Sequence, residues 1–454
     1  MTPPADKLTF REKFAYGLGD TASNFFFQAF NIFLAYYYTD VVGIKNSAAV
    51  GTLLGTVPIL VAAINPVIGV LADRTNTRWG KFRPWILWGA LPYGVLGYVM
   101  FANPGFSPDG QLVFAYVTYT LMLVAYAAIN TPYSALMGVM SSSSDDRTSL
   151  STYRFACAFL GALLIGWLVP GLSEFFSGIA GSKAGGFRYT MAIFAVASVA
   201  MFLYTFLNTR ERVAAPAGQK ESLREDLGNL FRNGPWLVLF FAGFLTLANT
   251  GMRSGSGVYY FKYVVGDFGG LGTFNLVGFL AFIAGALSTK LFTRYISRRK
   301  LMIGLTILNA LAMASFYFLD PHGMPLLYTV NIFASFVAGP TPAIVWSMYA
   351  DTADFGEWKF GRRSTGLIFS ATVFVQKVGL ALGSAMIGWL LAHYGYVAEA
   401  TQTARSVHGI MLLFSVLPGC FALLSGFAIF FYPLEEDKVK QIEHDLAARK
   451  GAPA

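Results

Sequence analysis

The chain has 454 residues, of which 55% are hydrophobic and only 13% are charged. Soluble domains carry roughly 25% charged residues, and their surface grows too fast with size to hide this much apolar material, so a soluble fold is excluded. The net charge of +9 does not indicate nucleic-acid binding, because the basic residues stand in short loops between apolar stretches, which is typical of membrane orientation.

Long apolar stretches follow one another along the whole chain. A helix needs about 20 apolar residues to cross the hydrocarbon core. Each stretch must be helical, because unpaired backbone groups are costly in lipid. Residues 1–13 are polar and lack the apolar region of a signal peptide, so the first apolar helix is expected to be the first span. The sequence predicts twelve spans, at residues 14–40, 48–72, 84–103, 111–139, 150–178, 187–208, 235–264, 271–291, 300–319, 324–350, 365–394 and 406–432.

The basic residues are distributed unevenly between the two predicted faces. The termini and the loops on their side hold 24 of the 33 lysines and arginines. By the positive-inside rule this face is cytoplasmic, so both termini are expected in the cytoplasm. The opposite face carries five basic residues, and four more lie inside predicted spans: Arg154, Arg253, Lys290 and Lys377.

The longest polar break divides the predicted spans six and six. The expected organisation is an N-terminal six-helix bundle at 1–208, a central cytoplasmic loop at 209–233, a C-terminal six-helix bundle at 234–432 and a cytoplasmic tail at 433–454. A basic hinge follows the second span of each half, DRTNTRWGKFRPWILWG in the first and TRYISRRKLMIG in the second. This echo fits two parallel repeats with a substrate site between them. Alternatively, it reflects only the tendency of cytoplasmic loops to be basic.

Four sequence blocks are much more specific than the hydropathy pattern. They are FAYGLGDTASNFFFQAFNIFLAYYYTDVVGIK at 14–45, NPVIGVLADRTNTRWGKFRPWIL at 65–87, NTPYSALMGVMSSSSDDRTSLSTYRF at 130–155 and DTADFGEWKFGRRSTGLIFSATVFVQKVG at 351–379. In this order, they resemble the glycoside–pentoside–hexuronide (GPH) cation symporters of the major facilitator superfamily, a family that includes melibiose permease. The resemblance implies twelve helices in two bundles, alternating access, and a sugar moved with a cation.

Two of the basic residues inside spans are candidates for substrate binding. An ionisable side chain in the bilayer is costly unless it is paired, so it is a functional candidate by default. Arg154 and Lys377 belong to opposite halves, so both can face a central cavity, and their donors suit sugar hydroxyls, a carboxylate or a sulfonate. The resemblance implies a role at the sugar site for both. The alternative is a structural ion pair, although no deep carboxylate lies near either residue in sequence.

Polar and aromatic residues in the spans extend this candidate site. The amides of Asn24 and Asn130 can donate to and accept from a hydroxyl, and the resemblance places them where melibiose permease has sugar-binding aspartates. The alternative is hydrogen bonding between helices. Tyr133, Tyr16 and Trp346 are candidates for stacking on a pyranose, with ordinary packing as the alternative.

The expected cation site departs from the family pattern. Sodium-coupled members hold the ion with two carboxylates on the second helix and an oxygen on the fourth. The matching positions here are Val61, Asn65 and Ala127, and a hard cation needs more oxygen ligands than one amide supplies. We therefore expect proton symport or uniport instead of sodium coupling. Asp20, the one clearly embedded acid, is either the proton carrier or a structural partner for a basic residue.

A cytoplasmic gate is the last candidate site. Charged residues from both halves fall on the predicted cytoplasmic side, where ion pairs between them would close the inward mouth and break on opening. The alternative is a solvated loop that only sets topology. The gate residues are Asp73, Arg74, Arg78, Lys81 and Arg83 after the second span and Asp351, Asp354 and Glu357 at the end of the tenth. The amphipathic stretch 434–449 is expected to lie on the membrane surface.

Other function classes lack their signatures. An intramembrane enzyme would need a nucleophile–base pair or a metal cluster, and two cysteines and no metalloprotease or esterase motif argue against one. A channel would need rings of like groups. A lipid or amphiphile transporter of the same superfamily stays the alternative, although the embedded polar residues favour a small polar substrate. The expected partners are a sugar or sugar acid, a proton in the symport alternative and the bilayer, with a monomer, no cofactor and no metal.

Overall fold

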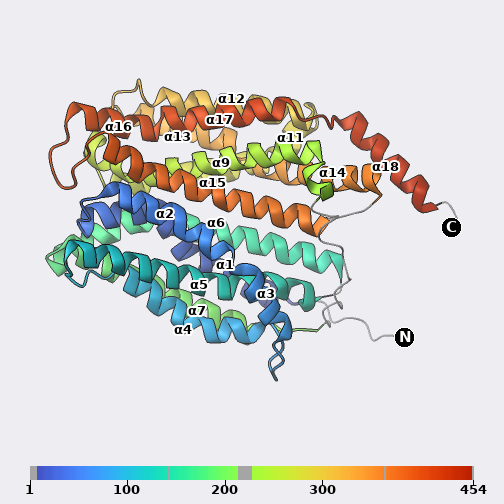
Figure 1. Cartoon of the computed structure of the whole chain (residues 1–454), viewed down its shortest axis with the longest axis horizontal. Helices are drawn as coiled ribbons and strands as arrows, with labels where there is room; N and C mark the ends of the chain where they lie inside the picture. Colours follow the sequence, from blue (N-terminus) through green and yellow to red (C-terminus); the bar gives the residue numbers. More distant parts are fainter. Residues whose placement is uncertain (1–7, 142, 213–227, 362–364, 452–454) are drawn as a thin grey trace. The chain divides into compact units, whose positions relative to one another are not determined.

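The computed structural model describes residues 8–141, 143–212, 228–361 and 365–451. Within these ranges all regular structure is helical, apart from one isolated bridge between Thr77 and Gly80 (Figure 1). Among the described residues, eight segments are long and apolar enough to cross a membrane: Pro108–Met140, Ser149–Ala180, Lys183–Asn208, Gly234–Val265, Gly270–Thr293, Met324–Phe360, Leu367–His393 and Ala404–Phe430. The prediction of an all-α membrane protein is confirmed.

The described residues of the first half form six helical segments, of which the first two are interrupted. The first runs through three elements and the second through two. The second is divided because α2 ends at Ala62, one turn before Pro66, which is the second residue of α3. Proline lacks the N–H that would continue the ladder and opens a helix well at its first turn. The elements are α1 (Phe10–Ala29), η1 (Phe30–Leu34), η2 (Tyr37–Val41), α2 (Ser47–Ala62), α3 (Asn65–Arg74), α4 (Arg83–Met100), α5 (Pro108–Met140), α6 (Ser144–Ala180) and α7 (Lys183–Asn208).

In the part of the second half that the structure describes, there are six further segments and a final helix. The tenth segment continues to residue 360, ten residues beyond the predicted end. The elements are α9 (Gly234–Tyr260), η3 (Phe261–Val265), α10 (Gly270–Leu287), α11 (Thr289–Thr293), α12 (Arg298–Ser315), α13 (Met324–Ala338), α14 (Thr341–Phe360), α15 (Thr365–His393), α16 (Ala404–Phe414), α17 (Val416–Phe430) and α18 (Glu436–Gly451).

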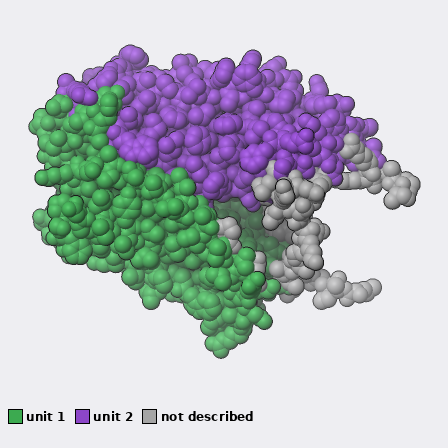
Figure 2. All heavy atoms as spheres, viewed as in Figure 1, with its two compact units in different colours: residues 1–217, 266–275, 391–403 green, residues 218–265, 276–390, 404–454 purple. Residues whose placement is uncertain are grey.

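The chain clusters into two compact units (Figure 2). Unit 1 contains residues 1–217 together with 266–275 and 391–403, and unit 2 contains residues 218–265, 276–390 and 404–454. Two short segments from the second half therefore belong to unit 1. In unit 1, α1 packs along α6 and α7. In unit 2, α17 packs along α9 and α12.

An acidic residue that follows the sixth helix of each half binds the start of the third helix of the same half. In unit 1, the Glu211 carboxylate accepts hydrogen bonds from the backbone N–H groups of residues 81–83, at 2.9, 2.8 and 3.0 Å. In unit 2, Glu436 accepts from the Arg298 N–H at 3.2 Å, and Glu435 pairs with the Arg299 side chain. Carboxylates stabilise helix N-termini, where N–H groups lack partners. The similarity between the two basic loops, one in each half, thus includes the carboxylates that bind them.

The C-terminal helix α18 differs from the expectation of a helix lying on the membrane surface. Its apolar residues Val439, Ile442 and Leu446 are buried in the core cluster of unit 2. The Trp358 indole of α14 donates a hydrogen bond to Asp445 at 2.9 Å. The expectation was wrong about the apolar face of this helix, because that face packs on α14 of its own unit.

Arg253 donates a hydrogen bond at the interruption between α16 and α17. Pro418 has no N–H to give to the Phe414 carbonyl, so the helix breaks at Ser415 and leaves that oxygen without its usual donor. The Arg253 guanidinium donates to this oxygen and lies 3.4 Å from the Phe414 ring centroid. The neighbouring Leu413 carbonyl accepts from Ser256 at 3.1 Å.

Replacing Arg253 by methionine is therefore expected to destabilise the protein. The substitution keeps the length of the side chain but removes the charged donor, and a hydrogen bond to a charged group is worth about 2 kcal/mol. A lower thermal unfolding midpoint of the purified protein, partly restored by Arg253→Lys, is the expected result. An unchanged midpoint would show that the Arg253 hydrogen bond does not contribute to the stability of the protein.

Candidate functional site

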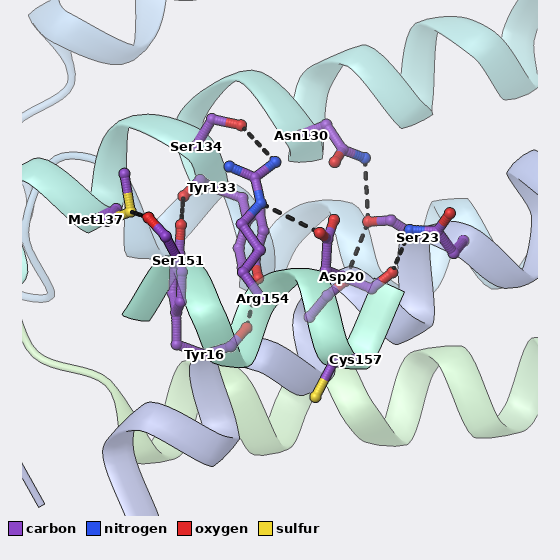
Figure 3. A network of polar contacts seen from close by, with 12 residues as sticks. Tyr16, Asp20, Ser23, Asn130, Tyr133, Ser134, Met137, Ser151, Arg154 and Cys157 are labelled. Carbon is purple, nitrogen blue, oxygen red and sulfur yellow. Dashed lines mark hydrogen bonds and ion pairs between the residues drawn. The ribbon is translucent and has the colours of Figure 1, made fainter. Parts of the chain in front are cut away.

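The centre of the candidate site in unit 1 is an ion pair between two neighbouring helices. Arg154 on α6 points toward α1, where its Nε lies 3.1 Å from the Asp20 Oδ2 (Figure 3). The same guanidinium donates to Ser134 Oγ of α5 at 3.2 Å. The two charged side chains are 26% and 10% exposed, so the pair is largely withdrawn from its surroundings but still reachable at the arginine. Of the two roles left open for Asp20, the structure displays the partnership with a basic residue.

Two tyrosines form a packed layer beside this pair. The rings of Tyr16 and Tyr133 stack at a centroid distance of 4.7 Å, and each hydroxyl donates to the backbone carbonyl of the other residue. Both side chains are fully buried, and the Arg154 guanidinium lies 5.3 Å from the Tyr133 ring centroid. A Cβ at Gly19 would come within 2.6 Å of the Tyr133 ring, so glycine is needed for this close approach. In this structure the two tyrosines pack and support the arginine, and neither presents a face for stacking.

The two candidate asparagines flank the ion pair with one end of each amide engaged. Asn130 Nδ2 donates to Ser23 Oγ at 3.0 Å, and Asn24 Nδ2 donates to the Asp20 carbonyl at 2.9 Å (Figure 3). Both side chains are half-buried, and neither Oδ1 has a hydrogen-bond partner among the described residues. An amide oxygen of this kind can accept a hydrogen bond from a ligand hydroxyl. Helix-to-helix bonding and ligand binding are thus compatible here.

In unit 2, Lys377 and Trp346 lie on different helices. Lys377 is half-buried on α15 and has no carboxylate within ion-pair distance in the part of the chain that is described. Trp346 on α14 stacks on Phe369 at 5.7 Å with nearly parallel rings and stays 36% exposed. An indole held on one face leaves its other face available for an apolar surface. Among the described residues of unit 2, Lys377 is therefore a cation without a carboxylate partner.

The predicted gate residues have several partners within their own units. Arg83 donates to the Phe206 carbonyl at 2.6 Å, Arg78 lies 4.5 Å from the Trp79 ring centroid, and Asp351 pairs with Arg298 at 2.9 Å. These contacts neither require nor exclude a gate. Of the other predicted gate residues, the side chain of Asp73 lies outside the described residues, Arg74 is exposed, and Lys81, Asp354 and Glu357 are half-buried.

Two ion pairs tie the start of α1 to its neighbours. Glu12 lies 2.5 Å from Arg212, and Lys13 lies 3.0 Å from Asp146. Burial raises the pKa of Glu12, but hydrogen bonds from Thr9 and Arg212 outweigh this effect and hold its pKa below the usual value. The hydrogen bond from Lys13 lowers the pKa of Asp146. Both carboxylates are therefore charged near neutral pH, and both pairs are lost only as the pH falls through these lowered values.

A separate polar cluster in unit 1 was not foreseen from the sequence. It joins segments from the two halves of the chain, because residues 391–403 belong to this unit. Lys183 at the start of α7 pairs with Glu399 at 2.5 Å, and the Tyr396 hydroxyl donates to Asp40 at 2.6 Å. Glu399 adopts a left-handed backbone with φ +56°, which is uncommon for a residue with a side chain. The partners in these two contacts are 216 and 356 residues apart in the sequence, so no local pattern could predict that they meet.

Comparisons with known proteins identify the family of the chain. The family model described as "MFS/sugar transport protein" matches residues 15–436. The chain is 34% identical to the inner membrane symporter YicJ of Escherichia coli, over 98% of this chain and 96% of that protein. It is 32% identical to the isoprimeverose transporter of Lactiplantibacillus pentosus, over 95% and 90%.

Solved structures show the same fold. A crystal structure of a D-xylose–proton symporter superimposes with a TM-score of 0.63 at 14% identity, covering 93% of this chain and 98% of that one. The chain thus has the major facilitator fold. With the family model and the relatives, this shows that the chain belongs to the glycoside–pentoside–hexuronide sugar transporters of the major facilitator superfamily, and that it is a multi-pass membrane transporter and not an enzyme.

Proposed function

We propose that this transporter binds a sugar or glycoside through polar residues from both halves and moves it by alternating access. The observation that carries this proposal is the group of Arg154, Asn24 and Asn130, which combines a reachable guanidinium with two amide oxygens that lack partners among the described residues. Donors and acceptors placed together in this way match vicinal hydroxyls. Lys377 and Trp346 contribute the second half of the site.

The pairing of Arg154 and Lys377 bears on the charge of the substrate and gives two candidates. Asp20 balances Arg154, so the cluster in unit 1 has no excess positive charge and favours a neutral sugar. Lys377 has no carboxylate partner in the described part of unit 2, which favours a sugar acid as the second candidate. A half-buried cation without a counter-charge is partly desolvated, and an anionic ligand would offset that cost.

We infer that the coupling ion is a proton or that the transporter is uncoupled. Val61 and Ala127 offer no side-chain oxygen, and Asn65 offers a single amide, which is a poor set for sodium. Asp20 can carry the proton. When its carboxylate is protonated, the charge that holds Arg154 disappears and the guanidinium is free to bind the sugar. When the sugar leaves, Arg154 pairs with Asp20 again and the proton is released.

Proteoliposomes containing the purified chain test this function. Counterflow of radiolabelled substrate against a panel of pentosides, hexosides, uronates and sulfonated sugars is expected to identify a sugar or glycoside. Uptake is expected to be unchanged when sodium is replaced by potassium. Stimulation by an inward proton gradient supports symport, and its absence supports uniport. A clear sodium requirement would contradict the inferred coupling, and counterflow with lipids but no sugar would contradict the substrate class.

We propose the bundle boundaries at 1–208 and 234–432, both termini in the cytoplasm, the cytoplasmic gate and a monomer as the working unit. The excess of basic residues on one predicted face supports this orientation. In intact cells, a cysteine introduced at Lys45 is expected to react with a membrane-impermeant maleimide, and one introduced at the exposed Arg74 is not. The reverse pattern would invert the topology.

A further inference from the structure

Unit 2 contains a cavity whose lining includes only one residue of the proposed transport site, Trp346. Its volume is about 330 Å³, and its lining comes from α9, α10, α12, α13, α14, α15 and α17. Every lining residue belongs to unit 2, and Lys377 is not among them. The polar residues that matter here are Thr246, Asn249, Thr250, Thr306, Gln376 and Ser425. Ligand pockets in proteins measure about 300–1,000 Å³, so this cavity suits a single small ring.

The hydroxyl groups in the lining present oxygen acceptors to the cavity. Thr250 donates its proton to the Thr246 carbonyl at 2.9 Å, and Thr306 donates to the Met302 carbonyl at 2.7 Å. Ser425 donates to the Ala242 carbonyl at 3.0 Å, so the 2.9 Å contact between the hydroxyls of Thr246 and Ser425 has Thr246 as its donor. A hydroxyl has one proton and two lone pairs. With the protons engaged, the hydroxyl oxygens can still accept.

Asn249 adds an amide whose hydrogen bonding is incomplete. The side chain is only 5% exposed and lines the cavity, and its Oδ1 has no hydrogen-bond partner among the described residues. Leaving a buried acceptor unpaired is costly, so such a group is usually satisfied by a partner that the bare chain does not supply. A rotation about the last side-chain bond lets the amide present either its oxygen or its nitrogen to the cavity.

The lining also restricts the charge of a ligand. It contains no charged residue, and the whole lining is described, so an anion would find neither a cation nor a set of free donors. A cation would lack a carboxylate. The remaining surface is apolar and includes Met302, Met313 and Trp346, which can cover the C–H face of a ring. A neutral molecule with several hydroxyl donors and an apolar face fits all of these features.

We propose that this cavity is a second binding site, which takes one neutral sugar ring or polyol through hydroxyl donation to Asn249 and its hydroxyl neighbours. The site lies within one unit and uses neither Arg154 nor Lys377, and it shares only Trp346 with the proposed transport site. The proposal is argued from Asn249 and the hydroxyl groups of the lining, none of which belongs to that transport site.

Equilibrium dialysis of the full chain in lipid nanodiscs tests the proposal, in an Arg154→Ala background that removes the transport site. The probes are radiolabelled methyl pyranosides, neutral methyl xyloside and methyl glucoside against anionic methyl glucuronide. At least one neutral probe is expected to bind with a stoichiometry near one, and the glucuronide is expected not to compete. Adding Asn249→Leu is expected to weaken this binding at least tenfold, whereas Ser254→Ala, on the same helix but outside the lining, is expected to leave it unchanged.

Two results would overturn the second site. One is that no neutral probe binds to the Arg154→Ala protein, which would mean that the cavity holds only water or lipid. The other is that the Asn249→Leu protein, with an unfolding midpoint equal to that of its parent, still binds the probe with full affinity. If only the assignment of the transport site is wrong, the result is different. The Arg154→Ala protein would then transport normally, and the neutral probe would still bind at the cavity.

Discussion

Replacing Arg154 by alanine is expected to reduce uptake by about two orders of magnitude while leaving the protein inserted in the membrane. The guanidinium is the charged donor of the proposed sugar site in unit 1, and it is held in place by Asp20, Ser134 and the Tyr133 ring. A hydrogen bond from a charged group contributes about 1.5–3 kcal/mol, and 1.4 kcal/mol corresponds to tenfold in rate at low substrate. Initial rates of uptake, normalised to the amount of protein in the membrane, measure the effect.

Lysine at the same position is the matched control. Arg154→Lys keeps the positive charge but loses the planar fork that serves Asp20 and Ser134 together, so an intermediate rate is expected. Lys377→Ala is expected to lose uptake in the same way. Wild-type transport by either alanine variant, at wild-type protein levels, would remove that residue from the site.

Asp20→Asn separates the two roles of the ion pair. The amide cannot take up a proton, so accumulation driven by a proton gradient is expected to be lost. Exchange of labelled for unlabelled sugar needs no net proton movement, so counterflow is expected to persist. If Asp20 only stabilises Arg154 structurally, both activities should fall together, because removing one partner leaves an unpaired charge in the protein interior.

Cross-linking residue 183 to residue 399 is expected to stop transport almost completely. Lys183 and Glu399 come from the two halves of the sequence, yet they pair at 2.5 Å within unit 1. Alternating access requires segments of the two halves to separate during each cycle, and a covalent link between them would prevent this. The experiment uses Lys183→Cys with Glu399→Cys and a short, reducible bis-thiol reagent. The two native cysteines, Cys157 and Cys420, are first replaced by alanine.

A second cysteine pair shows whether the loss is specific. Lys13 and Asp146 are also an ion pair in unit 1, at 3.0 Å, but both come from the first half of the chain. Linking these two positions is expected to leave transport intact, because helices within one bundle are expected to move together. Reduction should restore the activity of the 183–399 pair. Normal transport with the 183–399 link in place would mean that this contact does not open during the cycle.

Local sequence predicts some parts of this molecule well. The helical segments match the predicted spans because the free energy of placing a residue in lipid depends mainly on its own side chain and sums along a helix. Arg154 and Lys377 stand out for the same reason, since a basic residue in an apolar stretch is costly wherever the helix packs. The family follows from four sequence blocks, and the comparisons confirm it.

Other parts depend on partners that the sequence does not place side by side. The sequence leaves open which basic residue Asp20 would pair with, and the structure pairs it with Arg154, 134 residues later, on a helix that packs along α1. Arg253, left without a role in the sequence, supplies the donor that Pro418 withholds from the Phe414 carbonyl. Glu211 lies in a polar loop that looks solvated, yet it caps the start of α4.

The sequence by itself therefore determined that this is an all-α membrane transporter of a known sugar-transporting family, with basic residues embedded in its helices. Only the tertiary structure decided which charges are paired, which tyrosines are buried, and where an uncharged cavity lies. The physical reason is the range of the interactions. Burial in lipid acts on each residue along the chain, whereas ion pairs, caps and cavities exist only between helices that folding has brought together.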